Sequence, residues 1–178
     1  MVRPESQSAL AELMLEVRDM GLDDVEIRPA LRGDREAVCR VLTRSIREVA
    51  VPHYDNDERL VEFWCSQAME TVDQAISDPS FYVVVAKLAP DEIVGVETLH
   101  NEGEVKQCYV TPEARQKGIG EKILGELEYR ARQIGLKELR LNSTLGARSF
   151  YERNGFKLAG QPFMWNGTIK VHPMSKRL

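Results

Sequence analysis

From Cys108 onward the sequence predicts a strand, a glycine-containing loop and a helix in direct succession. Pro112 closes the strand because it has no N–H group to donate to a sheet. The loop 115–120 runs directly into the helix, whose first amides lack backbone partners and carry partial positive charge. Gly118 and Gly120 remove side chains that would hold a ligand away from these amides. The segment therefore predicts a site for a pyrophosphate or similar anion. The helix has an apolar stripe of Leu124, Leu127, Ala131 and Ile134.

Two common phosphate-binding loops do not match this segment. The P-loop pattern requires Lys and Ser or Thr after its last glycine, whereas Glu121 and Lys122 follow Gly120 here. The dinucleotide-binding pattern requires a third glycine where this chain has Ile123. The loop instead resembles the R/Q-x-x-G-x-G/A loop of the GNAT acyl-CoA N-acyltransferases, whose amides hold the pyrophosphate of coenzyme A. The matching residues are Arg115, Gln116, Lys117, Gly118, Ile119 and Gly120.

A second segment resembles the same family. Residues 147–156, Ala-Arg-Ser-Phe-Tyr-Glu-Arg-Asn-Gly-Phe, are similar to its A-x-x-F-Y-x-x-x-G-F signature. A predicted strand separates the two motifs, in the order that the family requires. The resemblance covers residues 25–178 and implies a GNAT N-acetyltransferase domain there, preceded by a helical extension at 1–24. Apolar residues at helical spacing predict an amphipathic helix at 8–20 in that extension, and its stripe must be buried either on the domain or on a second subunit, in a homodimer.

Hydrophobic periodicity predicts the order β-α-α-β-β-β-α-β-α-β-β. Asp34 is placed to cap the first of these helices and Asp57 to start the second. The resemblance implies an α/β (α+β) GNAT fold: a mixed, mostly antiparallel sheet of about seven strands, flanked by helices and splayed between strands 104–110 and 137–142. The right-handed crossover rule places these two strands parallel. The other predicted strands are 25–28, 81–87, 93–99, 156–158 and 168–174.

The amino-acid composition restricts the classes of molecule that the protein is expected to bind. A net charge of −4 argues against general binding to nucleic acid. No apolar run approaches 18 residues, and the polar face of the 8–20 helix is acidic, so no association with a membrane is expected. Cys39, Cys65 and Cys108 are widely spaced, which favours reduced thiols over a disulfide framework or a zinc site. We expect a cytoplasmic protein without a metal.

The resemblance implies chemistry at two residues. Tyr151 matches the tyrosine that faces the thioester sulfur and can protonate the departing thiolate. Glu104, four residues before Cys108, matches the glutamate of the histone-acetylating branch and is the first candidate for the base. Strand alternation puts Glu104 on the same side as Lys106 and Cys108. Glu97 on the preceding strand is the second candidate. Some branches place the base at the position of Leu139, and leucine cannot serve.

Further residues match positions that contact the coenzyme. Cys108, Tyr109 and Val110 match the strand end whose backbone groups hold the acetyl carbonyl and the pantetheine amides. Thr144 stands where family members usually carry an asparagine that touches the pantetheine arm, and Asn142 can substitute for it.

The sequence thus predicts an N-acetyltransferase that moves the acetyl group of acetyl-CoA to a primary amine by direct attack on the thioester. The acceptor is a small-molecule or peptide amine, and its groove is expected within residues 45–64. The alternative is a non-catalytic module that binds or senses acyl-CoA, which would keep the loop but lack a competent base.

Overall fold

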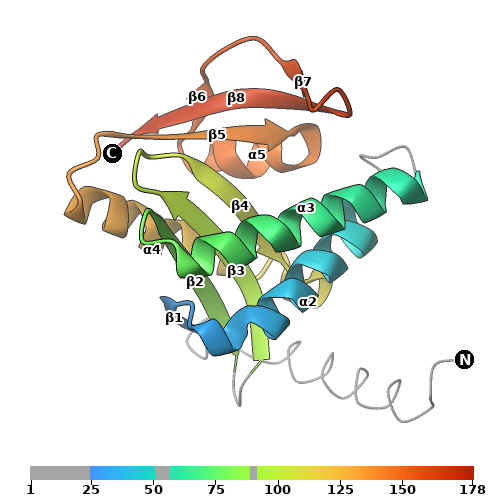
Figure 1. Ribbon diagram of the computed structural model, residues 1–178. Coiled ribbons are helices and arrows are strands. Elements are labelled where there is room, and N and C mark those ends of the chain that lie inside the picture. The colour runs from blue at the N-terminus through green and yellow to red at the C-terminus, as the bar shows by residue number, and fades with distance from the viewer. Residues whose placement is uncertain (1–24, 51–56, 89–91) are drawn as a thin grey trace, which may run out of the picture.

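The computed structural model describes residues 25–50, 57–88 and 92–178 (Figure 1). The predicted helix at 8–20, and with it the extension at 1–24 and the homodimer that it can form, lies outside the described residues. Most of the predicted acceptor segment 45–64 is described, but its central residues 51–56 are not.

Two sheets of four strands form the body of the protein. In the first sheet all neighbours are antiparallel, in the order β1-β2-β3-β4. Its strands are β1 (Val25–Pro29), β2 (Phe81–Leu88), β3 (Glu92–His100) and β4 (Val105–Val110). The second sheet has β8 at its centre, paired with β5 on one edge and with β6 and β7 on the other. Its strands are β5 (Glu138–Thr144), β6 (Lys157–Leu158), β7 (Phe163–Trp165) and β8 (Ile169–Arg177).

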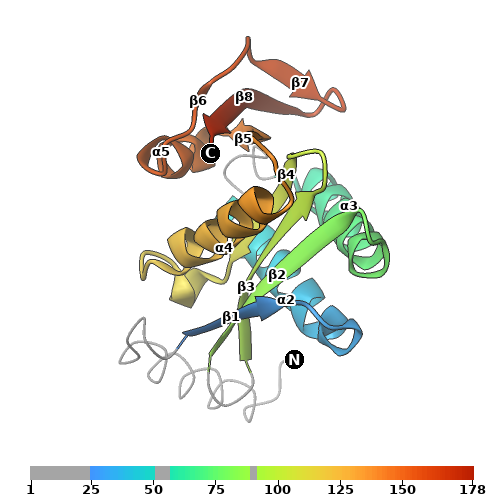
Figure 2. The ribbon, with the colours of Figure 1, turned by 90° about the vertical axis from the view of Figure 1, so that its left-hand side faces the viewer.

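Helices flank both faces of the first sheet (Figure 2). Apolar side chains from α2 and α3 form one core cluster with Val83 and Val85 of β2, and those from α4 form the other with Val84 and Ala86. The middle of β2 is therefore buried on both faces, as its continuous apolar run suggests. The helices are α2 (Arg35–Ser45), which continues into the π-helical turn η3 (Ile46–Ala50), α3 (Glu58–Ser77), α4 (Ile119–Gln133) and α5 (Leu145–Arg153), with short 3-10 turns η2 (Arg32–Asp34) and η5 (Pro112–Ala114).

The predicted fold class is confirmed, with differences in detail. The described residues form eight strands rather than about seven, because the sequence pattern missed the short strand β7. Asp57 caps α3 as expected, accepting the amide of Arg59 at 2.9 Å. Asp34 does not cap α2 with its side chain, because its carboxylate pairs with Arg28 at 2.6 Å instead. Ile134 was expected on the buried stripe of α4, but it follows the helix and is 40% exposed.

The two sheets meet along β4 and β5, which run parallel and pair at one point. Glu104 and Arg140 form a single parallel bridge there. The amide of Arg140 donates to the carbonyl of Gly103 at 2.8 Å, and its guanidinium donates to the carbonyl of Glu102 at 3.1 Å. In the described part of the chain no further backbone pairing joins β4 to β5. The splay predicted from the sequence is thus confirmed.

This meeting point depends on Gly103, which has a φ of +90°. A Cβ atom there would lie 2.7 Å from the backbone carbonyl oxygen of Glu138, which has no freedom to rotate away. We predict that Gly103→Ala lowers the free energy of unfolding by about 2 kcal/mol or more, from the strained φ together with the overpacking. Urea denaturation measures the change.

Gly125 provides the matched control because it is an exposed glycine inside α4 with open space around its Cβ position. Gly125→Ala should raise the free energy of unfolding by about 0.5–1 kcal/mol, since alanine favours a helix interior. A Gly103→Ala protein as stable as the wild type would contradict the tight junction between the sheets.

Candidate active site

The anion-binding loop predicted from the sequence lies between η5 and α4. Gln116 has a φ of +60° and Gly118, the N-cap of α4, has a φ of +75°. No side chain caps this helix start. The amides of its first turn therefore have no intrahelical acceptor. The side chain of Ile119 is buried, so this residue has only its backbone to offer a ligand. The loop has the backbone geometry of an anion-binding nest.

Gly120 also has a packing role, which the loop pattern in the sequence does not predict. A Cβ atom at this position would lie 3.1 and 3.2 Å from two ring carbons of Phe150. The missing side chain thus lets the start of α4 approach α5 closely. Because Phe150 belongs to the second motif, this contact joins the two motifs that the sequence presents separately.

Lys117 has an unusual environment. Its Nζ atom is buried and has no hydrogen-bond partner among the described residues. A buried ammonium group without a partner is costly unless an anion compensates it. Arg115 and Gln116 on the same loop are exposed. The loop residues therefore fit a diphosphate group, with Lys117 supplying charge and the helix start supplying amides.

An ion pair holds the beginning of this loop. Arg44 of α2 donates two hydrogen bonds to the carboxylate of Glu113 in η5, at 2.6 and 2.9 Å. Burial acts to raise the pKa of Glu113, but the bonds from Arg44 prevail and lower it. A bidentate pair fixes orientation as well as distance. No local sequence pattern indicates this ion pair, because Arg44 and Glu113 are 69 residues apart in the chain.

The predicted coenzyme-contacting residues of β4 and β5 lie where the two strands part. Cys108, Tyr109 and Val110 are half-buried at the carboxyl end of β4. Beyond the bridge at Glu104, the described edge of β4 that faces β5 has no backbone pairing. On β5, Asn142 is exposed, and Thr144 is half-buried as the N-cap of α5 with no capping bond from its hydroxyl. In the chain, β4 leads through η5 into the loop, and β5 leads directly into α5.

Tyr151 lies on the α4 side of this region. It is 7% exposed and packs edge-to-face against Phe150 and Phe156, with centroid distances of 5.1 and 5.5 Å. Its hydroxyl lies close enough to the thiol of Cys108 for the two groups to interact. Burial raises the pKa of Tyr151 well above its ordinary value, and the charge that Cys108 can carry raises it further. The phenol is therefore a neutral proton donor at pH 7.

Burial likewise raises the pKa of the Cys108 thiol, and the nearby carboxyl group of Glu97 raises it further. A neutral thiol is a poor nucleophile. Cys108 thus has the properties of a hydrogen-bonding neighbour of Tyr151 rather than of an attacking group.

Glu97 is the residue whose surroundings differ most from expectation. It pairs across the sheet with Cys108 and is 0% exposed. Among the described residues neither of its carboxyl oxygens has a hydrogen-bond partner of ordinary geometry, although the thiol of Cys108 is near enough to interact with them. Burial raises the pKa of Glu97 well above its ordinary value of 4.5. A β-bulge explains the placement: the register shifts by one residue between Thr98 and Leu99, so that Glu97 pairs with Cys108 rather than with Gln107.

Glu104, the first candidate for the base, lies apart from this group. It precedes β4, is half-buried, and its carboxylate pairs with Lys106 at 2.5 Å. The bulge puts Val105 and Cys108 in the same core cluster, although they are three residues apart. Strand alternation therefore does not relate Glu104 to Cys108, and the expected common face is wrong. The structure brings Tyr151 and Cys108 together with Glu97 instead.

The buried carboxyl group makes stability depend on pH in a defined direction. The folded state holds the Glu97 proton more tightly than the unfolded state does, so its contribution is complete below pH 4.5 and is lost as pH rises toward the folded-state pKa. We predict that Glu97→Gln becomes more stable relative to wild type by about 1.4 kcal/mol per pH unit from pH 5 upward. Urea denaturation at several pH values measures this slope.

Glu36→Gln, at an exposed position on α2, is the control and should show no comparable slope. Parallel stability curves for Glu97→Gln and wild type would mean that the carboxyl group is not held in its neutral form.

Within residues 25–50, 57–88 and 92–178, no helix combines the length and the hydrophobicity that are needed to cross a membrane. No group of three or more His, Cys, Asp or Glu side chains in the same ranges is arranged to hold a metal ion.

Comparisons with known proteins agree with this geometry. The model of the acetyltransferase (GNAT) domain family matches residues 49–178. Among curated proteins, the chain is 20% identical over 140 residues to the uncharacterized N-acetyltransferase YafP of Escherichia coli, covering 79% of this chain and 86% of that protein.

Solved structures show the same fold. A GCN5-related N-acetyltransferase from Rhodopseudomonas palustris superposes with a TM-score of 0.77 at 22% identity, over 89% of this chain and 99% of that one. The PaiA N-acetyltransferase from Thermoplasma acidophilum, solved with coenzyme A, gives a TM-score of 0.71 at 26% identity, over 86% and 99% of the two chains. With a family model that matches most of its length, the chain belongs to the GNAT acetyltransferase family.

Proposed function

We propose that the protein is an N-acetyltransferase that moves the acetyl group of acetyl-CoA, its co-substrate, to a primary amine of a small molecule or peptide. The observation that carries this proposal is the position of Tyr151. Its neutral hydroxyl lies at the end of β4, on α5, where the adjacent Phe150 packs against Gly120 at the end of the loop 115–120.

The comparisons support the choice of substrates. The PaiA N-acetyltransferase, a relative at 26% identity, was solved with coenzyme A. An aminoglycoside 6'-acetyltransferase type Ii shares the fold with a TM-score of 0.66, and its name gives an amine-bearing acceptor. In this chain, the diphosphate of acetyl-CoA would bind at Arg115–Gly120, and its thioester would supply the activated acetyl group. Cys108–Val110, Asn142 and Thr144 would contact the pantetheine arm.

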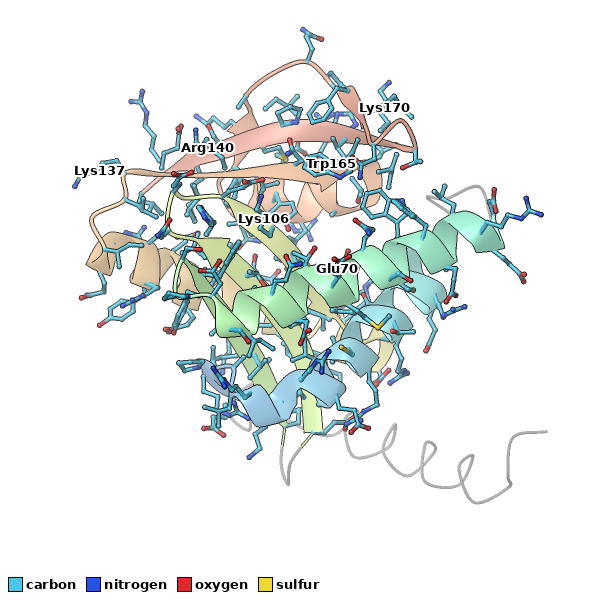
Figure 3. All side chains as sticks on the ribbon, in the orientation of Figure 1. Glu70, Lys106, Lys137, Arg140, Trp165 and Lys170 are labelled. Carbon is cyan, nitrogen blue, oxygen red and sulfur yellow. The ribbon has the colours of Figure 1, made fainter. Side chains whose placement is uncertain are left out.

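The acceptor needs its neutral form for attack. An amine with a pKa near 10 is almost fully protonated at pH 7, and releasing the free base costs roughly 4 kcal/mol. We propose Glu104, directly or through water, as the base, because its carboxylate is half-buried beside β4 rather than sealed inside the sheet. Figure 3 shows Glu70 on α3 and Lys106 on β4, with Arg140 and Trp165 on the second sheet above them in this view. We place the approach of the acceptor on the side of the first sheet that α3 covers.

The proton balance of the reaction involves two residues. The amine nitrogen forms a bond to the acetyl carbon as the bond from that carbon to sulfur breaks. The amine's proton passes to Glu104, and the hydroxyl of Tyr151 gives its proton to the departing sulfur. A direct transfer of this kind requires no acyl intermediate on Cys108, in agreement with the raised pKa of that thiol.

A screen of amines with acetyl-CoA, scored by release of the free thiol, tests the proposal. We predict that at least one amine supports steady turnover and that Tyr151→Phe lowers kcat by about a hundredfold, the low end of the range for loss of a general acid. The KM for acetyl-CoA should change little, because the proton is needed only as the sulfur departs.

Tyr129→Phe is the matched control, since Tyr129 is exposed on α4, and it should retain wild-type kcat. Tight binding of acetyl-CoA without turnover on any amine would favour the non-catalytic binding module. Full activity of Tyr151→Phe would exclude Tyr151 as the donor and leave the acetyltransferase assignment intact.

A further inference from the structure

Glu97 is a buried titratable group that the proposed reaction does not use. A carboxyl group that is sealed in the sheet, with only a thiol near its oxygens, destabilises the fold as pH rises above its unfolded-state pKa. An apolar side chain of similar size would fit among the surrounding core residues at lower cost. Packing alone therefore gives no reason for a carboxyl group at this position.

The neighbours of Glu97 form a sequence of contacts that ends at the proposed proton donor. Glu97 is opposite Cys108 on the paired strand, and Cys108 packs against the core cluster that contains Tyr151, with its thiol close enough to interact with the Tyr151 hydroxyl. The three groups come from β3, β4 and α5, on the face of the first sheet that α4 covers. Each is close enough to affect the ionisation of the next.

Charged side chains on the elements packed against this cluster act on its ionisation. Glu128 of α4 acts on Glu97 as a nearby negative charge. It is itself paired with Lys176 of β8, and more loosely with Arg132 at 3.5 Å. Glu121 of α4 acts on Cys108 in the same direction. The surroundings thus favour the neutral carboxyl group, and the described cations nearby are bound to Glu128.

We propose that Glu97 is a positioning residue: its neutral carboxyl group fixes the thiol of Cys108 and, through that thiol, the hydroxyl of Tyr151 where β4 and β5 part. Ionised Glu97 would place a negative charge beside Cys108 and weaken Tyr151 as a proton donor. The catalytic effect rests on the proposed function, whereas the coupling of Glu97 to Cys108 does not.

The coupling is measured without any turnover. Iodoacetamide labelling of each cysteine, followed by peptide mass spectrometry between pH 7 and pH 10, reports the thiolate fraction at Cys108. Because an ionised Glu97 opposes the Cys108 thiolate, Glu97→Gln should leave the Cys108 rate unchanged at pH 7 and raise it by about tenfold, equivalent to one pKa unit, at the alkaline end of this range, where the wild-type carboxyl group loses its proton. Cys39, on the outer helix α2, is the internal reference and should not change. Glu126→Gln is the control protein, because Glu126 bonds to Tyr82 at 3.0 Å and takes no part in the cluster.

The effect on catalysis is measured with an amine that the screen identifies. Glu97→Gln keeps a neutral hydrogen-bonding group and should retain kcat at pH 7 while losing the decline of kcat at alkaline pH. Glu97→Leu keeps only the volume, and should be more stable than wild type at pH 8 yet about tenfold slower. In a Tyr151→Phe background, Glu97→Leu should cause no further loss, because the two residues act as one unit.

The outcomes separate the two proposals. A Cys108 labelling rate that is unchanged in Glu97→Gln at the alkaline end of the range would overturn the positioning role, and so would full activity of Glu97→Leu. Failure of every amine would contradict the proposed function alone, since the labelling experiment still decides whether Glu97 controls Cys108.

Discussion

The divergence of β4 and β5 is the constraint on which the rest of the structure depends. The two strands are held at one end by the bridge between Glu104 and Arg140 and by the close approach of Gly103 to the backbone of Glu138. From there they separate, which leaves an unpaired strand edge inside the protein. Unpaired backbone groups of this kind require partners, and a ligand with amide groups can supply them. The anion-binding loop and α5 lie at the end where the strands have parted, so the fold gathers its ligand-binding groups there.

The two faces of the first sheet differ in polarity and in access to solvent. On the face that α4 covers, Glu97, Cys108 and Tyr151 form a buried group in which burial favours the neutral state of each member. On the face that α3 covers, Gln107 donates to a carbonyl of α3 at 3.1 Å, and charged residues reach solvent. A donor to the sulfur and a base for the amine need opposite properties, one neutral and shielded, the other charged and accessible. The bulge in the β3–β4 pair separates them, since it puts Cys108 and Glu104 in different surroundings.

The sequence predicted the fold, and the order of strand, loop and helix from β4 to α4, well because both depend on local patterns. Gly118 adopts a left-handed conformation that glycine readily accepts, and the apolar runs of β2 and β3 are buried as their composition indicates. The prediction that was wrong, a common face for Glu104 and Cys108, depended on the register between β3 and β4. A single bulge residue decides that Glu97 faces Cys108, and no local signal in residues 97–108 marks it. The packing of Gly120 on Phe150 and the pair between Arg44 and Glu113 join segments that are distant in sequence, so only the folded structure could place them.

The proposed function depends on the binding of a diphosphate by the loop 115–120, and a calorimetric titration with acetyl-CoA tests this binding most directly. Wild-type protein should bind saturably, and Lys117→Ala should bind about tenfold more weakly, because it removes a charge-assisted hydrogen bond to the diphosphate. Lys137→Ala, which removes an exposed lysine beside β5, should bind as wild type does. Folded wild-type protein that gives neither binding heat nor thermal protection with acetyl-CoA would contradict the account.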